Sequence, residues 1–295
     1  MFVCVLTSAP ACPVIETPVV EALRNGWGGG DARWLARGVA AEFDLGVRPS
    51  NLEAVRQDMD GLGIDVNVAE AAGRRKRLLL ADMDSTMIRQ ECIDELADEA
   101  GVGERVAAIT ARAMNGEIGF EGALRERVGL LRGLDASVID RVLAERIELM
   151  PGGPELVATM KAHGAKAALV SGGFTAFTQA IAAKLSFDWN RANTLLIENG
   201  KLTGAPGEPI LGREAKVAAL EGLSAEMGIA EADVIAVGDG ANDLGMIKRA
   251  GLGVALHAKP AVQAEAQCRV NHGDLTALLY LQGYHRDDFA TPPQP

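Results

Sequence analysis

The sequence is poor in the residues that mark several classes of protein. Only four of its 295 residues are cysteine (Cys4, Cys12, Cys92 and Cys268), and they form neither a CxxC pair nor a spacing typical of zinc sites. We therefore expect small buried or half-buried thiols in a reducing compartment. Aromatic residues make up 4% of the chain, which leaves Ala, Leu, Val and Ile to form most of the core.

Long apolar segments and excess positive charge are also missing. No apolar run reaches the roughly 18 residues that a membrane-spanning helix needs, and the apolar N-terminus lacks the positively charged start of a signal peptide. The formal net charge of −11 argues against non-specific binding to nucleic acid or to an anionic membrane surface. We expect a cytoplasmic protein that acts on a small molecule. If that molecule is an anion, the site must hold local cations.

The length of the chain fits two domains. Residues 1–73 predict a small α/β unit, with strands at 2–6 and 64–68 and helices at 19–24, 32–42 and 52–62. The glycine-rich stretch 25–31 lacks the GxGxxG spacing of a dinucleotide site. We interpret the basic cluster 74–77 as a solvated linker, and the polar, proline-rich residues 284–295 as a flexible tail.

Beyond residue 78 the pattern alternates between strands and helices, which predicts a parallel sheet with helices on both faces. Residues 89–149 break this rhythm because they contain only helical patterns, so we expect a helical cap inserted into a core of residues 78–88 and 150–283. Asn199-Gly200 between two apolar stretches predicts a β-hairpin. The expected fold class is therefore α/β, a Rossmann-like parallel sheet with an inserted helical cap and a small N-terminal α/β domain.

The most informative motif is LLLADMDST, in which a leucine-rich strand ends in two acids, Asp82 and Asp84. Open α/β sheets bind their ligands at the carboxyl ends of their strands, and strand-to-helix turns offer free backbone N–H groups to anions. A carboxylate here can attack a phosphoryl group. Its neighbour can act as acid and base, which requires a raised pKa for Asp84.

Three later segments complete the chemistry. Ser171 and Gly172 end an apolar strand, where a hydroxyl and an unhindered N–H can approach a phosphate. Lys216 opens a predicted helix and supplies a point cation. The loop GDGAND contains two acids and an amide, which suit a Mg²⁺ ion, and its residues are Asp239, Asn242 and Asp243.

The order and spacing of these four motifs resemble the haloacid dehalogenase superfamily over residues 78–283. The resemblance implies that Asp82 is the nucleophile, that Asp84 is the acid and base, and that Lys216 holds the phosphate. It implies Mg²⁺ on Asp82, Asp239 and the backbone carbonyl of Asp84. Asp243 and Asn242 would orient these groups.

Within that superfamily, DSTMIRQECIDELA and MNGEIGFEGALRERVGLL resemble the phosphoserine phosphatase family, which acts in the last step of serine biosynthesis. The resemblance implies that Glu91 pairs with the ammonium group of phosphoserine and that Arg127 binds its carboxylate through a bidentate fork. Arg125 would point elsewhere on the helix. Phe120 either packs over the site as part of a lid or belongs to the core of the cap.

Several alternatives stay open at this point. The same chemistry could serve phosphohomoserine, another small phosphorylated metabolite, or transfer to a second alcohol. Residues 1–73 have the size of a regulatory ACT-type module without its clear fingerprint, and could instead be a degenerate relative that serves homodimer contact or stability. A non-catalytic relative is disfavoured because Asp82, Asp84, Lys216 and Asp239 are all present.

Overall fold

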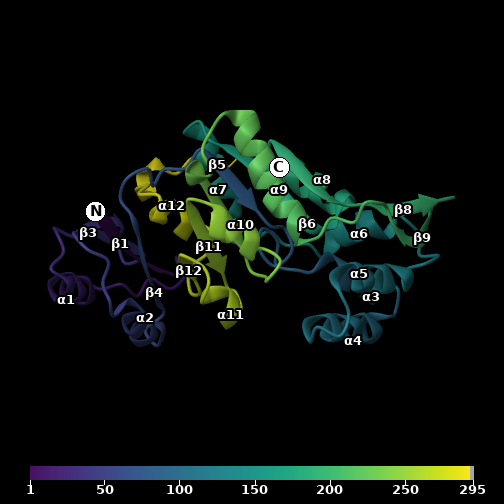
Figure 1. The fold of residues 1–295 in the computed structure, drawn as a ribbon, viewed down its shortest axis with the longest axis horizontal. Coiled ribbons are helices and arrows are strands. Elements are labelled where there is room, and N and C mark those ends of the chain that lie inside the picture. Colours follow the sequence, from purple (N-terminus) through teal and green to yellow (C-terminus); the bar gives the residue numbers. More distant parts are fainter. Residues whose placement is uncertain (293–295) are drawn as a thin grey trace.

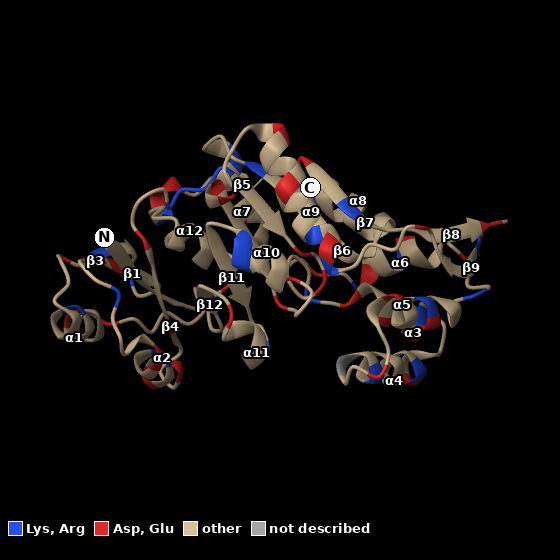
Figure 2. Cartoon of the chain, viewed as in Figure 1, with Lys and Arg blue, Asp and Glu red and all other residues tan. Residues whose placement is uncertain are grey.

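The computed structural model describes residues 1–292, which form three parts arranged in a row (Figure 1). A small sheet with two helices lies at one end, and a six-stranded sheet covered by helices forms the middle. A group of helices and a two-stranded hairpin lie at the other end. Acidic and basic residues are interspersed along the chain in all three parts (Figure 2). Among the described residues, no helix combines the length and apolar character that a membrane crossing requires.

The middle part is a parallel sheet in the order β12-β11-β10-β5-β6-β7. Its first strand along the chain, β5, lies inside the sheet, and later strands are added on both sides of it. Such a reversal of strand order marks the ligand-binding edge of an open α/β sheet. The strands are β5 (Leu78–Ala81), β6 (Lys166–Phe174), β7 (Trp189–Asn193), β10 (Val234–Gly238), β11 (Leu252–Leu256) and β12 (Cys268–Val270).

Helices cover both faces of this sheet, and alternate residues of β5 show why. Leu79 and Ala81 belong to one apolar cluster with residues of α7, α8 and α12, whereas Leu78 and Leu80 belong to a second with residues of α9 and α10. Successive side chains of a strand point to opposite faces, so a run of leucines is buried on both. The helices are α7 (Gly153–Ala162), α8 (Thr175–Leu185), α9 (Arg213–Met227), α10 (Leu244–Arg249), α11 (Pro260–Gln263) and α12 (Ala277–Leu281). The predicted α/β class is confirmed, with β7 as a strand that the sequence analysis missed.

The helices predicted between residues 89 and 149 all form, at the end of the molecule farthest from the N-terminal sheet (Figure 1). The turn of the predicted hairpin is also confirmed, because Asn199 and Gly200 adopt positive φ angles of 52° and 75°. The elements are α3 (Cys92–Glu99), α4 (Gly103–Met114), α5 (Phe120–Gly129), α6 (Val138–Glu145), β8 (Leu195–Glu198) and β9 (Lys201–Pro206).

The hairpin is attached to these helices rather than to the main sheet. The N–H of Gly133 donates to the carbonyl of Leu202 at 2.8 Å, and the N–H of Leu202 donates to the carbonyl of Leu134 at 2.9 Å. Helix α5 packs along β9. We call helices α3–α6 and the β8–β9 hairpin together the cap, which is therefore built from two separate segments of the chain.

The N-terminal part has the element order β1-α1-β2-β3-α2-β4, which is that of a split βαβ unit. The prediction of a helix at 32–42 was wrong, because this segment forms most of an antiparallel hairpin that turns at Gly38, whose φ is 75°. Pairing of β3 with β1 outweighs the helical propensity of an alanine-rich segment. The elements are β1 (Phe2–Ser8), α1 (Thr17–Trp27), β2 (Arg33–Ala36), β3 (Ala40–Leu45), α2 (Leu52–Asp60) and β4 (Ile64–Glu70).

The basic cluster at 74–77 is not the solvated linker that we expected. Lys76 is only 9% exposed, and its ammonium group donates to the carbonyls of Gly73 and Ala232, both at 2.8 Å. The guanidinium of Arg74 pairs with Glu42 at 2.6 Å. These cations fasten the N-terminal part to the main sheet, since each satisfies groups of the surrounding fold.

Two polar side chains of the edge strand β4 bind the edge of the main sheet. The carboxylate of Asp65 accepts three backbone N–H groups from the loop after β12, at 2.8, 3.0 and 3.1 Å, from Asn271, His272 and Gly273. The amide of Asn67 bonds both backbone groups of Arg269, as a neighbouring strand would. The two sheets are thus joined edge to edge through side chains. Residues near the end of the described chain also pack, since the ring of Phe289 lies 5.2 Å from that of Tyr280.

Candidate active site

The motif residues converge at the carboxyl edge of the main sheet. Asp82 and Asp84 directly follow β5, Ser171 lies near the end of β6, and Asp239 follows β10. Because β5 pairs with both β6 and β10, the three turns meet at one place. Lys216 reaches the same place from the first turn of α9.

Lys216 is a buried cation between two carboxylates. Its Nζ lies 2.6 Å from Oδ2 of Asp82 and 2.5 Å from Oδ1 of Asp243, and its side chain is 2% exposed. Burial alone would lower the pKa of Lys216, but the negative charges of Asp243 and Asp82 outweigh burial and raise that pKa. The lysine is therefore positively charged at neutral pH and fixes the position of both carboxylates.

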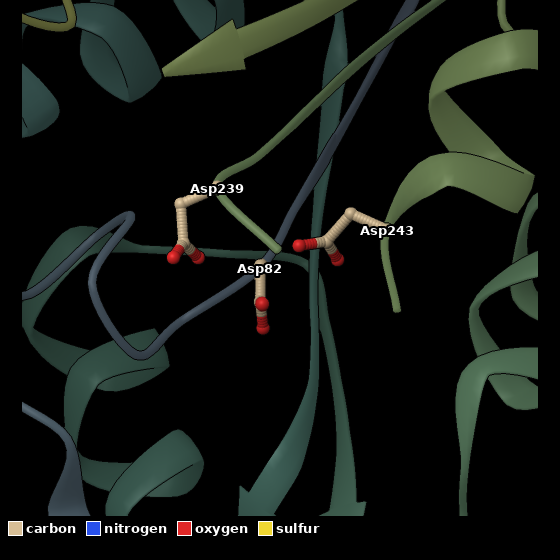
Figure 3. Close-up of side chains that lie close together, drawn as sticks. All are labelled: Asp82, Asp239 and Asp243. Atoms are coloured by element: carbon tan, nitrogen blue, oxygen red, sulfur yellow. The ribbon is translucent and has the colours of Figure 1, made fainter. Parts of the chain in front are cut away.

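Three carboxylates form a compact cluster of oxygen atoms beside this lysine. Asp82, Asp239 and Asp243 each contribute one oxygen to a group in which all lie within 4.8 Å of one another. Asp82 follows β5, whereas Asp239 and Asp243 belong to the loop between β10 and α10, and Figure 3 shows these two on either side of Asp82. Burial, followed by the charge of Asp82, raises the pKa of Asp239 to about 6, and the same causes raise the pKa of Asp243. This donor set suits a hard divalent cation, because one lysine does not balance three carboxylates.

Asp84 is held from both sides of its carboxyl group. Its Oδ1 accepts the backbone N–H of Cys92 at 2.8 Å, and its Oδ2 accepts the hydroxyl of Ser171 at 3.0 Å. The hydroxyl oxygen of Ser171 in turn accepts the N–H of Gly173 at 2.8 Å. Burial raises the pKa of Asp84 against the effect of these hydrogen bonds. The raised pKa is the property that a general acid at this position needs.

Gly173 has no room for a side chain. A Cβ atom at this position would lie 2.5 Å from Oδ2 of Asp84 and 3.0 Å from the hydroxyl oxygen of Ser171. Any other residue would displace the Asp84 carboxyl group. Glycine is therefore required by the close approach of the backbone to an acid, in a loop for which the sequence analysis argued only from Gly172.

A cavity of about 140 Å³ lies between these residues and the cap. The sequence-predicted residues that line it are Asp82, Asp84, Glu91, Phe120, Arg127, Ser171, Gly172, Asp239 and Asn242. Lys216 and Asp243 are not on its surface but lie directly behind Asp82. The structure thus brings every candidate site residue of the sequence into one small region.

Glu91, the residue that precedes helix α3, lines the cavity. The hydroxyl of Ser85, whose φ of 54° is unusual for a residue with a side chain, donates to Oε1 of Glu91 at 2.7 Å. Glu91 is exposed as a whole residue, but it lines the cavity together with Asp84. Desolvation in this position, followed by the charge of Asp84, raises the pKa of Glu91 to about 8. A cationic group in the cavity would reverse this effect and favour the ionised carboxylate.

Arg127 and Arg125 of the same helix point in different directions, as the sequence analysis expected. Arg127 lines the cavity and donates from its Nη1 to the hydroxyl of Thr110 at 3.4 Å, while burial lowers its pKa. Arg125 instead pairs with Glu208, 2.5 Å away on the connection that leads to α9. Only Arg127 is therefore available to a molecule in the cavity.

The ring of Phe120 closes the cavity from the cap side. Cβ atoms built on Gly172 and Gly212 would lie 3.3 and 3.5 Å from this ring. The ring therefore rests on two backbone segments of the main sheet domain, although 37% of the residue is exposed. This placement matches the lid interpretation and not a position in the core of the cap.

Sequence reasoning also missed two groups that bind the site residues from outside the motifs. The backbone N–H of Cys92 binds Asp84, and no side-chain pattern reveals a backbone donor. The buried side chain of Asn193 binds the carbonyl of Gly172 at 2.8 Å. Its signal, a polar residue at the end of a strand, was lost because β7 itself was not predicted.

The fold and site define a class. The chain belongs to the haloacid dehalogenase-like hydrolase family, whose model matches residues 79–248, from β5 to α10. Among curated relatives, it is similar to the phosphoserine phosphatases of Archaeoglobus fulgidus and Haemophilus influenzae. They are 44% identical over 246 residues and 50% identical over 204 residues, which is 81% and 69% of this chain. The chain spans 71% and 65% of the length of these two relatives.

A solved structure is similar along nearly the whole chain. The probable phosphoserine phosphatase of Vibrio cholerae, in unliganded form, superposes with a TM-score of 0.78 at 35% identity. The match covers 97% of this chain and 88% of the other. The N-terminal part is therefore included in the shared architecture.

Proposed function

We propose that this chain hydrolyses O-phospho-L-serine to L-serine and phosphate, the final step of serine biosynthesis, and does so through an aspartyl-phosphate on Asp82. One observation carries the proposal. The small cavity is lined by the acids Asp82, Asp84 and Asp239 and by two further residues of opposite charge, Arg127 and Glu91. These groups match the phosphate, the carboxylate and the ammonium group of phosphoserine. The similarity to phosphoserine phosphatases supports the same substrate.

Mg²⁺ is the proposed cofactor. The residues fit it, because Asp82, Asp239 and Asp243 supply a tight set of oxygen donors with more negative charge than Lys216 balances. We assign Asp82, Asp239 and the backbone carbonyl of Asp84 as ligands, with Asp243 orienting Lys216. When bound, the ion would withdraw charge from the phosphate oxygens and allow two anions to approach.

The residues of the chain carry the two chemical steps. An oxygen of Asp82 forms a bond to phosphorus while the bond between phosphorus and the serine oxygen breaks, and Asp84 gives its proton to that oxygen. A water molecule then attacks the phosphorus of the aspartyl-phosphate, Asp84 takes a proton from it, and Asp82 is released with free phosphate. Lys216, on the far side of Asp82, holds the nucleophile in place and stabilises the transferring phosphoryl charge.

The remaining cavity residues position the substrate. Asn242 and the backbone at Gly172 would hold phosphate oxygens, and Phe120 would exclude water from the closed site. Ser171 donates its hydroxyl hydrogen to Asp84, so it would contribute by positioning that acid rather than by binding the phosphate. Arg127 would bind the substrate carboxylate. Glu91 would bind the ammonium group, whose positive charge would lower the pKa of Glu91 and favour its ionised carboxylate. The substrate thus supplies the cation that Glu91 lacks.

The first test is phosphate release from O-phospho-L-serine, phosphohomoserine, phosphothreonine and a sugar phosphate, each with Mg²⁺ and with chelator. We expect a strong Mg²⁺-dependent preference for phosphoserine. Replacement of Asp82 by Asn should abolish turnover while the circular dichroism spectrum stays unchanged. Equal turnover of another ester would keep the chemistry and discard the proposed substrate, whereas full activity of D82N would contradict the mechanism.

Arg127 offers a sharper test because Arg125 is its matched control. R127A should raise the KM for phosphoserine by roughly 10- to 150-fold, since a charged hydrogen-bonded pair is worth about 1.5–3 kcal/mol. The KM for p-nitrophenyl phosphate, which has no carboxylate, should stay within about twofold. R125A should leave both constants near those of the wild type, because Arg125 faces Glu208. Equal effects of R127A on both substrates would show that Arg127 does not bind a carboxylate.

A further inference from the structure

A buried amide outside the cavity controls the geometry of one of its walls. Asn193, the last residue of β7, is 2% exposed and is absent from the cavity lining. Its Nδ2 donates to the carbonyl of Gly172 at 2.8 Å and to the carbonyl of Leu211 at 3.2 Å. Its Oδ1 accepts the N–H of Leu211 at 2.7 Å. The amide thus ties the turn at the end of β6 to the residues that precede α9.

The contact with Gly172 extends to Asp84 through a single peptide unit. The carbonyl of Gly172 and the N–H of Gly173 belong to the same planar group, so fixing one fixes the other. That N–H donates to the hydroxyl oxygen of Ser171, which leaves the hydroxyl hydrogen to be donated to Oδ2 of Asp84. A rotation of this peptide would move the N–H of Gly173 away from the hydroxyl oxygen of Ser171. The hydroxyl could then turn away from Asp84.

Gly172 and Gly173 lie near the end of β6, between two points at which this strand pairs with β7, at Val170 and at Phe174. Residues 172 and 173 are both glycine, which allows many backbone conformations, and the pairing register between β6 and β7 shifts between Val170 and Phe174. The Asn193 amide replaces the strand pairing that is lost at this shift. It holds these two glycines next to the acid that the proposed mechanism uses twice.

We propose that Asn193 is a positioning residue for the phosphatase reaction, acting on Asp84 through the Gly172–Gly173 peptide and the hydroxyl of Ser171. This inference rests on the proposed function. Asn193 touches neither substrate nor cofactor, and its effect belongs to the chemical step rather than to recognition of the amino acid. Loss of its donors should therefore lower kcat, with little change in KM, for any phosphate monoester that the enzyme accepts.

The test replaces Asn193 with Asp, which keeps the size and the acceptor for Leu211 but removes the donor to Gly172. In the full-length protein with Mg²⁺, N193D should lower kcat at least about tenfold, by the same factor with phosphoserine and p-nitrophenyl phosphate, because general acid–base groups contribute about 10²–10⁴-fold. Both KM values should stay within about threefold. N190A is the matched control on the same strand, since Asn190 contacts Thr178 instead, and it should keep the wild-type constants.

Thermal unfolding followed by circular dichroism separates this role from a structural one. The assay is run well below the melting temperature of each variant, where a residue that only stabilises the fold would leave kcat unchanged. Wild-type kcat in folded N193D would overturn the proposal. If N193D does not fold, N193S, which leaves space for water to solvate the freed carbonyls, is judged by the same criteria. Failure of the wild type to release phosphate from either ester would instead refute the proposed function.

Discussion

At the scale of single residues, the site depends on a balance of buried charges. Lys216 is the shared partner of Asp82 and Asp243, and all three side chains are at most 7% exposed. Breaking a buried ion pair by removing one partner leaves an uncompensated charge, which costs far more than losing an exposed pair. The stability of the fold is therefore coupled to the residue that holds the nucleophile.

Replacement of Lys216 by Met should lower the free energy of unfolding by about 3–5 kcal/mol and abolish turnover. Urea denaturation in chelator measures this change. Lys248→Met is the matched control, because Lys248 pairs with Glu265 on the surface, where both side chains are about half exposed. That control should change stability by less than about 1 kcal/mol. Equal effects of the two substitutions would contradict the buried-pair argument.

Glu91 makes the stability of the metal-free protein depend on pH. Its pKa rises from an ordinary value of 4.5 to about 8 on folding, so the folded state retains a proton that the unfolded chain loses. The free energy of unfolding should therefore fall as pH rises from about 4.5 to about 8, and level off above that. Asp239, with a pKa raised to about 6, acts in the same direction over a narrower range.

Urea denaturation in chelator, from pH 5 to pH 8.5, tests this dependence with the variant E91Q. Glutamine does not titrate, so the decline of stability with pH should be shallower than in the wild type. Glu121→Gln, at the exposed start of α5, should reproduce the wild-type slope. Identical slopes for E91Q and the wild type would mean that Glu91 is already ionised in the folded protein.

The residue scale also shows where sequence reasoning succeeds. Asp82, Asp84 and Asp239 could be placed from the sequence because each lies within three residues of the end of an apolar strand, and parallel strands end at a common edge. Asn193 could not, because its function depends on two loops that are distant in sequence. The restriction at Gly173 was equally hidden, since it follows from the position of Asp84 in space.

At the scale of elements, strands were predictable where both of their faces are apolar. The strands of the main sheet appear in the sequence as apolar runs, with the exception of β7, whose sequence WNRAN is polar because it lies at the sheet edge. The segment 32–42 was misassigned because its many alanines favour a helix, whereas its hairpin depends on pairing with a strand about 35 residues earlier in the chain. Local patterns carry no information on such partners.

Asp65 makes three of the hydrogen bonds that join strand β4 to the main sheet. D65N should lower the free energy of unfolding by roughly 3 kcal/mol, because an amide offers one acceptor and presents its own donors to three backbone N–H groups. Urea denaturation measures this loss. D60N is the matched control at the same interface, where Asp60 meets His272 at 2.9 Å and is 63% exposed. The control should change stability by less than about 1 kcal/mol.

The two outcomes carry different meanings. A large loss in D65N with phosphatase activity retained would establish Asp65 as a structural connection between the sheets. A change no greater than that of D60N would show that the interface depends on other contacts, such as the pair between Arg74 and Glu42.

At the scale of the whole molecule, the N-terminal part and the cap lie at opposite ends of the main sheet (Figure 1). Among the described residues, those that line the cavity all come from position 82 onward. The residues for catalysis and for substrate recognition therefore belong to the main sheet domain and the cap. The N-terminal part could act on them only through its contacts with the main sheet domain, which include the edge strand β12 and helix α12. The assignment of the N-terminal part as an ACT-like module stays a prediction.

The cap itself is assembled from two stretches of chain that leave the main sheet at different points. Residues 92–145 follow β5, whereas residues 195–206 follow β7, and the two meet through the hydrogen bonds of Gly133 and Leu202. Four connections therefore cross between cap and sheet. A chimera that exchanges only the helical stretch with a relative would combine a foreign helix surface with a native hairpin. Both segments shape the cap that covers the substrate. An exchange of substrate specificity between relatives must therefore transfer residues 92–145 and 195–206 together.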